Sequence, residues 1–178
     1  MRTVTILDDY QRVALASADW TEVERRFRIE TIADHLDGEA LVERLRRSDV
    51  VVAMRERTAF LAEVLERLPA LRLLVTTGMH NAAIDLTAAA GRGIVVSGTG
   101  GAGNGVPELT IGMMIALTRH IAAEDASVRS GGWQHTIGPG LAGKTLGVLG
   151  LGRLGTAVAR LARAFDMRII AWSRSLTP

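Results

Sequence analysis

The chain of 178 residues contains no cysteine and only four histidines. Without cysteine it can form no disulfide framework, no thiolate metal site and no thiol nucleophile. The histidines are too far apart in the sequence for the spacing of a metal-ligand set; they are His35, His80, His120 and His135. The sequence therefore predicts no bound metal.

The chain also lacks a strong net charge and any long apolar run. Its formal net charge is +2, and arginines stand beside glutamates in stretches such as "VERLRR", a pattern typical of solvated helix faces. No apolar run approaches the roughly 18 residues of a transmembrane helix, and the N-terminus lacks the pattern of a secretory signal. We therefore expect no nucleic-acid partner, no membrane span and a cytoplasmic location.

What the chain does contain is apolar sequence with a regular period. Apolar residues make up 48% of it and charged residues 22%, which is enough apolar material for a sizeable core. Over residues 1–100, short β-rich runs alternate with longer amphipathic runs, as in βα units around a parallel sheet. The predicted strands are 3–7, 27–32, 49–54, 71–76 and 93–97. They predict an α/β fold with a flavodoxin-like parallel-sheet domain.

Two helical patterns lie between these strands. In "DGEALVERLRRS" we expect Asp37 to cap the helix, and Leu41 and Leu45 to share one face. In "TAFLAEVLERLP" we expect Thr58 to cap the helix and Pro69 to end it. The apolar residues of this second helix are expected to face inward; they are Leu61, Val64, Leu65 and Leu68.

The stretch "GTGGAGNG" at residues 98–105 predicts a hinge or a domain crossover, because glycine leaves the backbone free to turn. The following "VPELTIGMMIALTRHIAAEDASVRSG" predicts one long helix, with Pro107 in its first turn and Gly131 and Gly132 at its end. We therefore expect two domains, residues 1–100 and residues 101–178.

A glycine turn follows at residues 150–155, with the spacing G-x-G-x-x-G between a strand pattern and a helix pattern. This context is the βαβ unit that a dinucleotide-binding fingerprint requires, and the alternative is a merely structural turn. Gly150 would permit the tight turn, Gly152 the approach of a pyrophosphate, and Gly155 close packing of helix on strand. The amides of Arg153 and Leu154 would then point at the phosphates from the helix N-terminus.

The second strand of this unit ends in "AWSRS", so Ser173 stands where an acidic residue would bind the ribose hydroxyls of NAD, and Arg174 follows it. A hydroxyl beside a guanidinium can accommodate a 2′-phosphate, which favours NADP over NAD. The alternative is that Arg174 is an ordinary surface arginine.

Together these features resemble the D-isomer-specific 2-hydroxyacid dehydrogenases, a family that includes phosphoglycerate, glyoxylate and formate dehydrogenases. The resemblance covers the whole chain, and its most specific part is "LAGKTLGVLGLGRLG" at residues 141–155. It implies an oxidoreductase that transfers hydride between NAD or NADP and a 2-keto or 2-hydroxy acid. In such enzymes the catalytic arginine, carboxylate and histidine follow the second strand of the nucleotide domain.

These catalytic positions would lie beyond Pro178, so the resemblance implies a chain that contains no catalytic residue and is inactive alone. It would then be the N-terminal part of a longer enzyme. The alternatives are a non-catalytic dinucleotide-binding or regulatory module, and an inert truncation product.

The resemblance also places substrate contacts in "LLVTTGMHNAAID", where the family holds the substrate carboxylate with backbone amides. Gly78 is kept, Met79 follows it, and His80 replaces the family's second glycine, so His80 is either a ligand contact or a loop-packing residue. Arg55 follows the third predicted strand and either pairs with the carboxylate or forms a salt bridge with a neighbour such as Glu56.

The start of the long helix matches a stretch that lies beside the nicotinamide in the family. Asn104 is therefore a candidate cofactor contact, or else a helix cap, and Glu108 lies in the same stretch. The resemblance further implies a homodimer, for which the apolar residues of this helix are candidates, or else they pack within the chain; they are Met113, Met114, Leu117 and Ile121.

Overall fold

The computed structural model describes residues 1–101, 103, 105–174 and 176. The chain divides into two compact units, Met1–Gly101 and Ala102–Pro178, each with its own core. None of the helices in the described part of the chain has the length and apolarity needed to cross a bilayer.

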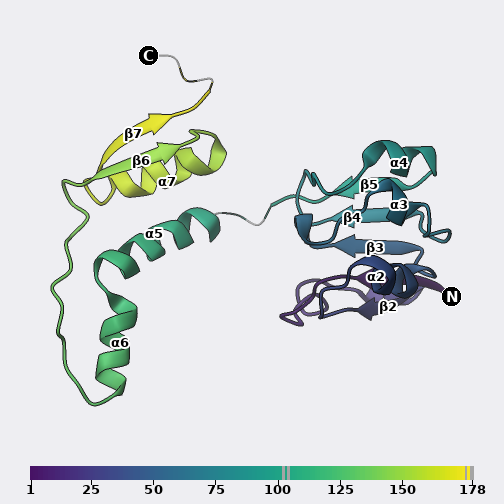
Figure 1. The fold of residues 1–178 in the computed structure, drawn as a ribbon, viewed down its shortest axis with the longest axis horizontal. Helices are drawn as coiled ribbons and strands as arrows, with labels where there is room; N and C mark the ends of the chain where they lie inside the picture. Colours follow the sequence, from purple (N-terminus) through teal and green to yellow (C-terminus); the bar gives the residue numbers. More distant parts are fainter. Residues whose placement is uncertain (102, 104, 175, 177–178) are drawn as a thin grey trace. The chain divides into compact units, whose positions relative to one another are not determined.

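The first unit is built on a five-stranded parallel sheet in the order β2-β1-β3-β4-β5 (Figure 1). This order confirms the predicted flavodoxin-like α/β fold. The observed strands start and end within two residues of the predicted ones; they are β1 (Arg2–Ile6), β2 (Phe27–Thr31), β3 (Val50–Ala53), β4 (Leu73–Thr76) and β5 (Val95–Gly98).

Short helices connect these strands: α1 (Thr21–Glu24), α2 (Gly38–Leu45), the 3₁₀ turn η1 (Arg55–Arg57), α3 (Ala62–Leu65) and α4 (Leu86–Gly91). Asp37 occupies the N-cap of α2, although its side chain makes no capping hydrogen bond. The prediction that Thr58 caps the next helix is wrong. Helix α3 begins only at Ala62, and the buried Thr58 hydroxyl donates instead to Asp8 Oδ2 over 2.8 Å.

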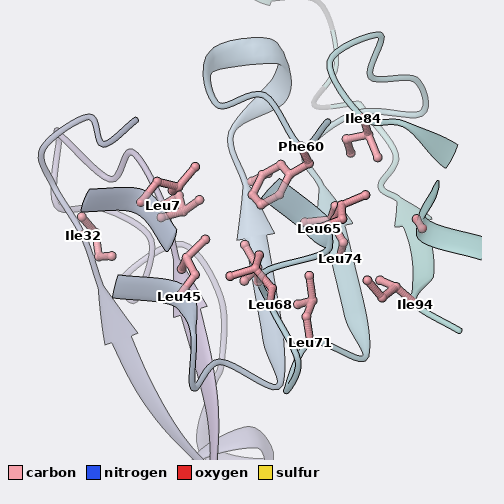
Figure 2. Packing of buried hydrophobic residues seen from close by; sticks show 14 residues of the cluster. Leu7, Ile32, Leu45, Phe60, Leu65, Leu68, Leu71, Leu74, Ile84 and Ile94 are labelled. Carbon is pink, nitrogen blue, oxygen red and sulfur yellow. The ribbon is translucent and has the colours of Figure 1, made fainter. Parts of the chain in front are cut away.

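The core of this unit lies between one face of the sheet and helices α2, α3 and α4. Leu65 lies beside Leu74 of β4, and both side chains, like Leu45 of α2 in the same cluster, are fully buried (Figure 2). Burial of each such side chain contributes about 1.5–3 kcal/mol. Leu61, which was expected to face inward, is 48% exposed because it precedes the shortened helix. The packed sheet gives the loops at its carboxyl edge a rigid support.

The second unit begins with α5 (Gly105–Thr118) and α6 (Ile121–Arg129), so the prediction of one long helix is wrong. His120 adopts a left-handed conformation with φ of 53°, which interrupts the helical hydrogen-bond ladder. Pro107 does lie in the first turn of α5, where its missing amide hydrogen is tolerated, and it is buried.

The rest of this unit is the predicted strand, turn, helix and strand. Strands β6 (Thr145–Leu149) and β7 (Arg168–Trp172) pair in parallel, and α7 (Arg153–Arg163) connects them. Ala162 of α7 and Ile111 of α5 are buried in one cluster with Met167. The βαβ prediction is therefore confirmed, and it fixes the turn between β6 and α7.

Candidate functional site

The glycine turn lies at the carboxyl end of β6. Gly150 has φ of +93°, a conformation that L side chains rarely adopt, and its amide donates to the Trp172 carbonyl of β7 over 2.7 Å. This hydrogen bond places the end of β7 directly beside the turn. The carboxyl ends of β6 and β7, between which a dinucleotide site is built, therefore lie side by side.

The other two glycines of the turn have contrasting surroundings. A Cβ added to Gly155 would lie 2.1 Å from the Gly150 carbonyl oxygen, so only glycine lets α7 approach the turn this closely. A Cβ added to Gly152 would meet nothing within 4 Å. Gly155 is thus needed for packing within the unit, whereas Gly152 faces open space that a ligand can occupy.

The N-terminus of α7 offers unpaired hydrogen-bond donors. Gly152 is the N-cap and has no side chain to cap the helix, and the first turn contains no acidic residue. The amides of Arg153 and Leu154 donate to no other residue in the described part of the chain. Because a helix N-terminus also carries about half a positive charge, this end suits an anion. Donors, charge and open space fit the pyrophosphate of a dinucleotide.

Ser173 and Arg174 follow β7 immediately. Ser173 is half-buried and Arg174 is exposed, and Arg174 forms no ion pair within the described residues. Through the hydrogen bond between Gly150 and Trp172, both residues are adjacent to the glycine turn. The guanidinium is thus available to an anionic group near this strand end.

In the first unit, the structure brings Arg55 and Gly78 together. Arg55 follows β3 with φ of 47°, and Gly78 follows β4 with φ of 119°. A Cβ on Gly78 would lie 2.9 Å from Arg55 Nη1, so the guanidinium lies over the glycine. The turn is fixed because the Arg55 amide donates to Thr77 Oγ1 over 3.1 Å and Asn81 Nδ2 donates to the Arg55 carbonyl over 2.6 Å.

The amide of Gly78 is already used, because it donates to Thr99 Oγ1 over 2.9 Å. The Arg55 side chain forms no salt bridge among the described residues, Glu56 included, so its guanidinium is available to a carboxylate at this loop. Met79 and His80 are exposed beside a cleft of about 380 Å³ that also includes Asn81.

The structure shows a buried carboxylate that sequence analysis missed. Asp8 follows β1, is 2% exposed and has φ of 56°. Its Oδ1 lies 2.9 Å from His35 Nδ1, its Oδ2 accepts the hydrogen bond from Thr58, and Arg57 Nε lies 3.8 Å away. Asp8 thus ties together the loops after β1, β2 and β3. The paired aspartates in "ILDDY", directly after a buried strand, were the available signal.

Two other predicted groups have different outcomes. Asn104 lies outside the described residues, and Glu108 is exposed in the first turn of α5. Of the apolar residues proposed as an interface, Met114 packs against the core of the second unit, whereas Met113, Leu117 and Ile121 are 55%, 71% and 49% exposed.

Comparison with known proteins agrees with this geometry. Residues 111–178 match the NAD-binding domain of the D-isomer specific 2-hydroxyacid dehydrogenases. The chain is 37% identical over 147 residues to a hydroxypyruvate reductase of Thermotoga maritima, with 81% of this chain and 48% of the relative covered. It is 38% identical over 144 residues to a D-3-phosphoglycerate dehydrogenase of Methanocaldococcus jannaschii, with 79% of this chain and 27% of the relative covered.

Among solved structures, a phosphoglycerate oxidoreductase from Vibrio cholerae matches with a TM-score of 0.89 and 30% identity. That match covers 98% of this chain and 57% of the other. The chain therefore belongs to the D-isomer-specific 2-hydroxyacid dehydrogenase family. It spans about half the length, or less, of these relatives.

Proposed function

We propose that this chain supplies the substrate-binding and dinucleotide-binding parts of an NAD(P)-dependent D-2-hydroxyacid dehydrogenase. The unit Met1–Gly101 would bind the 2-keto or 2-hydroxy acid, and the unit Ala102–Pro178 would bind the dinucleotide. The observation that carries the proposal is the turn at Gly152, where free amides at a helix N-terminus face open space. Family membership supports it independently.

In this proposal each group of residues has a separate task. The amides of Arg153 and Leu154 bind the pyrophosphate, and Gly152 leaves room for it. The nicotinamide of the bound dinucleotide would supply or accept the hydride. Arg55 holds the substrate carboxylate in a charge-assisted hydrogen bond, and the Gly78 loop, with Met79 and His80, forms the wall beside it.

Reduction of a keto group also requires a proton at the resulting alkoxide, and we assign no general acid among the residues of this chain. We therefore propose that the chain binds its ligands without catalysing turnover by itself. Reduction of a 2-keto acid by the purified chain, measured as NADH oxidation above background, would contradict this part of the proposal.

The dinucleotide site is tested by a matched pair of glycine variants. In Gly152→Ala the added methyl group occupies the open space, so NADH affinity should fall about tenfold or more while the fold is retained. In Gly147→Ala the methyl group meets only Ile170 Cγ1 of β7 at 3.9 Å, an ordinary van der Waals contact, so affinity should be unchanged. Isothermal titration of both variants measures the difference. Equal affinities, or no NADH binding by the wild-type chain at millimolar concentration, would contradict the proposal.

The cofactor preference follows from Ser173 and Arg174, and we propose that it is for NADP. A charge-assisted contact from Arg174 to a 2′-phosphate contributes roughly 1.5–3 kcal/mol, equal to a tenfold to hundredfold preference. Arg174→Ala should weaken NADPH binding far more than NADH binding, and Ser173→Asp should shift the preference toward NADH. If neither variant changes the ratio of dissociation constants more than about twofold, Arg174 is an ordinary surface arginine.

We also propose a cytoplasmic homodimer in which α5 contributes to the interface. Val106, Leu109, Met113 and Leu117 are at least 55% exposed and recur at the spacing of one helix face. Light scattering should show a dimer that Met113→Glu dissociates. The control Ala40→Glu adds the same charge at an exposed position of α2 and should leave the mass unchanged.

A further inference from the structure

An apolar cavity of about 290 Å³ lies at the carboxyl ends of β1 and β3. Ile6 and Val52 line it at these strand ends, and Val13, Ala14 and Trp20 line it from the segment after β1. In a sheet of order β2-β1-β3-β4-β5, the chain changes direction between β1 and β3. Ligands of open α/β sheets bind at such a switch point, outside the carboxyl ends of the strands.

The polar groups in the wall of this cavity are engaged with the protein. Asp9 Oδ1 accepts from the amides of Val13 and Ala14 over 2.9 and 3.2 Å. Trp20 Nε1 donates to the Ala14 carbonyl over 3.1 Å, and Ser17 Oγ donates to the Val13 carbonyl over 2.7 Å. A ligand group in the cavity would gain little from polar contacts, and the Asp9 carboxylate would disfavour an anionic group there. The cavity is therefore suited to an apolar group.

The cavity adjoins the proposed carboxylate contact. Its wall includes Met54 and Thr77, the residues that directly precede Arg55 and Gly78. The Thr77 hydroxyl donates to Met54 Sδ over 3.4 Å and accepts from the Arg55 amide over 3.1 Å, so the wall and the Arg55 turn form one connected structure. Consecutive Cα atoms are about 3.8 Å apart, so the Cα atom of Met54 in the wall lies at that distance from the Cα atom of Arg55.

We propose that this cavity receives the apolar side chain of a 2-keto or 2-hydroxy acid whose carboxylate is bound by Arg55. This inference rests on the proposed function of the first unit and specifies its substrate class. An apolar cavity of about 150 Å³ is large enough for benzene, so this cavity has room for a branched butyl or a benzyl group. The chain would select such acids over those with a hydrogen, a hydroxymethyl or a phosphorylated side chain.

The test is the affinity of the 178-residue chain for a homologous series: pyruvate, 2-oxobutanoate, 2-oxopentanoate, 2-oxohexanoate and phenylpyruvate. Dissociation constants are measured from the shifts of the Arg55 and Gly78 amide resonances. Each methylene that enters the cavity should tighten binding about fourfold, until the cavity is filled. Arg55→Ala should weaken binding of every acid in the series.

Cavity-filling variants separate this inference from the proposed function. Ala14→Leu places a larger side chain in the wall, so affinity should no longer increase with chain length, while pyruvate should bind as in the wild type. Ala16→Leu adds the same group at an exposed position outside the wall and should change nothing. If Ala14→Leu does not fold, Ala18→Leu tests the same wall.

Each remaining outcome points to one of the two proposals. If affinity depends on Arg55 but is equal for all the acids, the cavity is not a side-chain subsite, and the proposed function stands. If affinity increases with chain length as strongly in the cavity-filling variant as in the wild type, the side chain binds elsewhere, and the inference is wrong. If no acid binds, the substrate role of the first unit fails together with the inference, whereas NADH binding is unaffected.

Discussion

Asp8 provides a sharp test of how the carboxyl edge of the first sheet is held together. Its carboxylate is buried and joins the loops after three strands through Thr58, His35 and Arg57. We expect Asp8→Ala to destabilise the unit Met1–Gly101 strongly. The loops that carry Arg55 should also lose their fixed position, because Thr58 directly follows the η1 turn.

The magnitude follows from what each partner loses. Thr58 is 2% exposed, so its hydroxyl would have no access to water and would cost about 1–3 kcal/mol when left unpaired. The His35 side chain is 45% exposed and can bind water instead, so its loss is smaller. Alanine at a φ of 56° costs roughly another 1–2 kcal/mol. The two quantified contributions add to about 2–5 kcal/mol, a large part of the 5–15 kcal/mol that stabilises a typical domain.

Thermal unfolding of this unit is followed by the fluorescence of Trp20, after the exposed Trp133 and Trp172 of the other unit are replaced by phenylalanine. A loss of about 2–5 kcal/mol corresponds to a fall in the midpoint on the order of 20 °C for a domain of this size. Asp8→Asn keeps the size and one acceptor oxygen, so its effect should be clearly smaller.

A second background isolates the Thr58 hydroxyl. In Thr58→Val no buried hydroxyl remains to be left unpaired, so Asp8→Ala should cost about 1–3 kcal/mol less in that background than in the wild type. If Asp8→Ala lowers the midpoint by less than about 4 °C, or by the same amount in both backgrounds, the carboxylate does not hold these loops together.

Two further predictions concern the second unit. Gly155→Ala should destabilise this unit by about 1–3 kcal/mol and abolish NADH binding, because the added Cβ would lie 2.1 Å from the Gly150 carbonyl oxygen. Unfolding is followed by Trp172 fluorescence, with Gly147→Ala as the control. An unchanged midpoint in Gly155→Ala would show that the close packing is unimportant. Hydrogen bonds from the Thr136 hydroxyl and from the amides of His135 and Thr136 lower the pKa of Glu124. These bonds, which connect α6 to residues 135–136, are therefore fully present above the ordinary carboxyl pKa. They are lost as the pH falls through the lowered pKa. The amide resonances of these two residues should shift in that acidic range in the wild type but not in Glu124→Gln, and identical titrations would refute the role of Glu124.

The sheet and the glycine turn were predictable because local sequence decides them. Buried parallel strands read as β-rich runs, and the spacing of Gly150, Gly152 and Gly155 has a specific steric meaning at a strand-to-helix turn. The added Cβ positions agree with that meaning at Gly155, where only glycine fits. Local pattern and tertiary structure favour the same conformation in these segments.

The sequence pattern fails at two places, and at the first of them a tertiary interaction overrides it. Thr58 has the sequence of a helix cap, but the buried Asp8 carboxylate accepts its hydroxyl and removes it from α3. At His120 the sequence continues with good helix formers and contains neither glycine nor proline, so nothing local marks the break between α5 and α6. Asp8 and Thr58 are 50 residues apart in the sequence, so the pattern around Thr58 gives no sign of this hydrogen bond.

Unusual backbone conformations in the first unit are found both at Asp8, which sequence analysis missed, and at Arg55 of the candidate site. Its non-glycine residues with positive φ are Asp8, Arg12 and Arg55, which follow β1 or β3 at the carboxyl edge of the sheet. Such conformations persist only where surrounding contacts hold them. Thr58 and His35 hold Asp8, whereas Thr77 and Asn81 hold Arg55 through its amide and carbonyl. Since the Arg55 side chain takes no part in those backbone bonds, its guanidinium stays available to a carboxylate while the turn that carries it is fixed. The strained backbone conformations therefore lie at the edge of the sheet where we place the substrate, whereas the strands beneath them were predictable from the sequence.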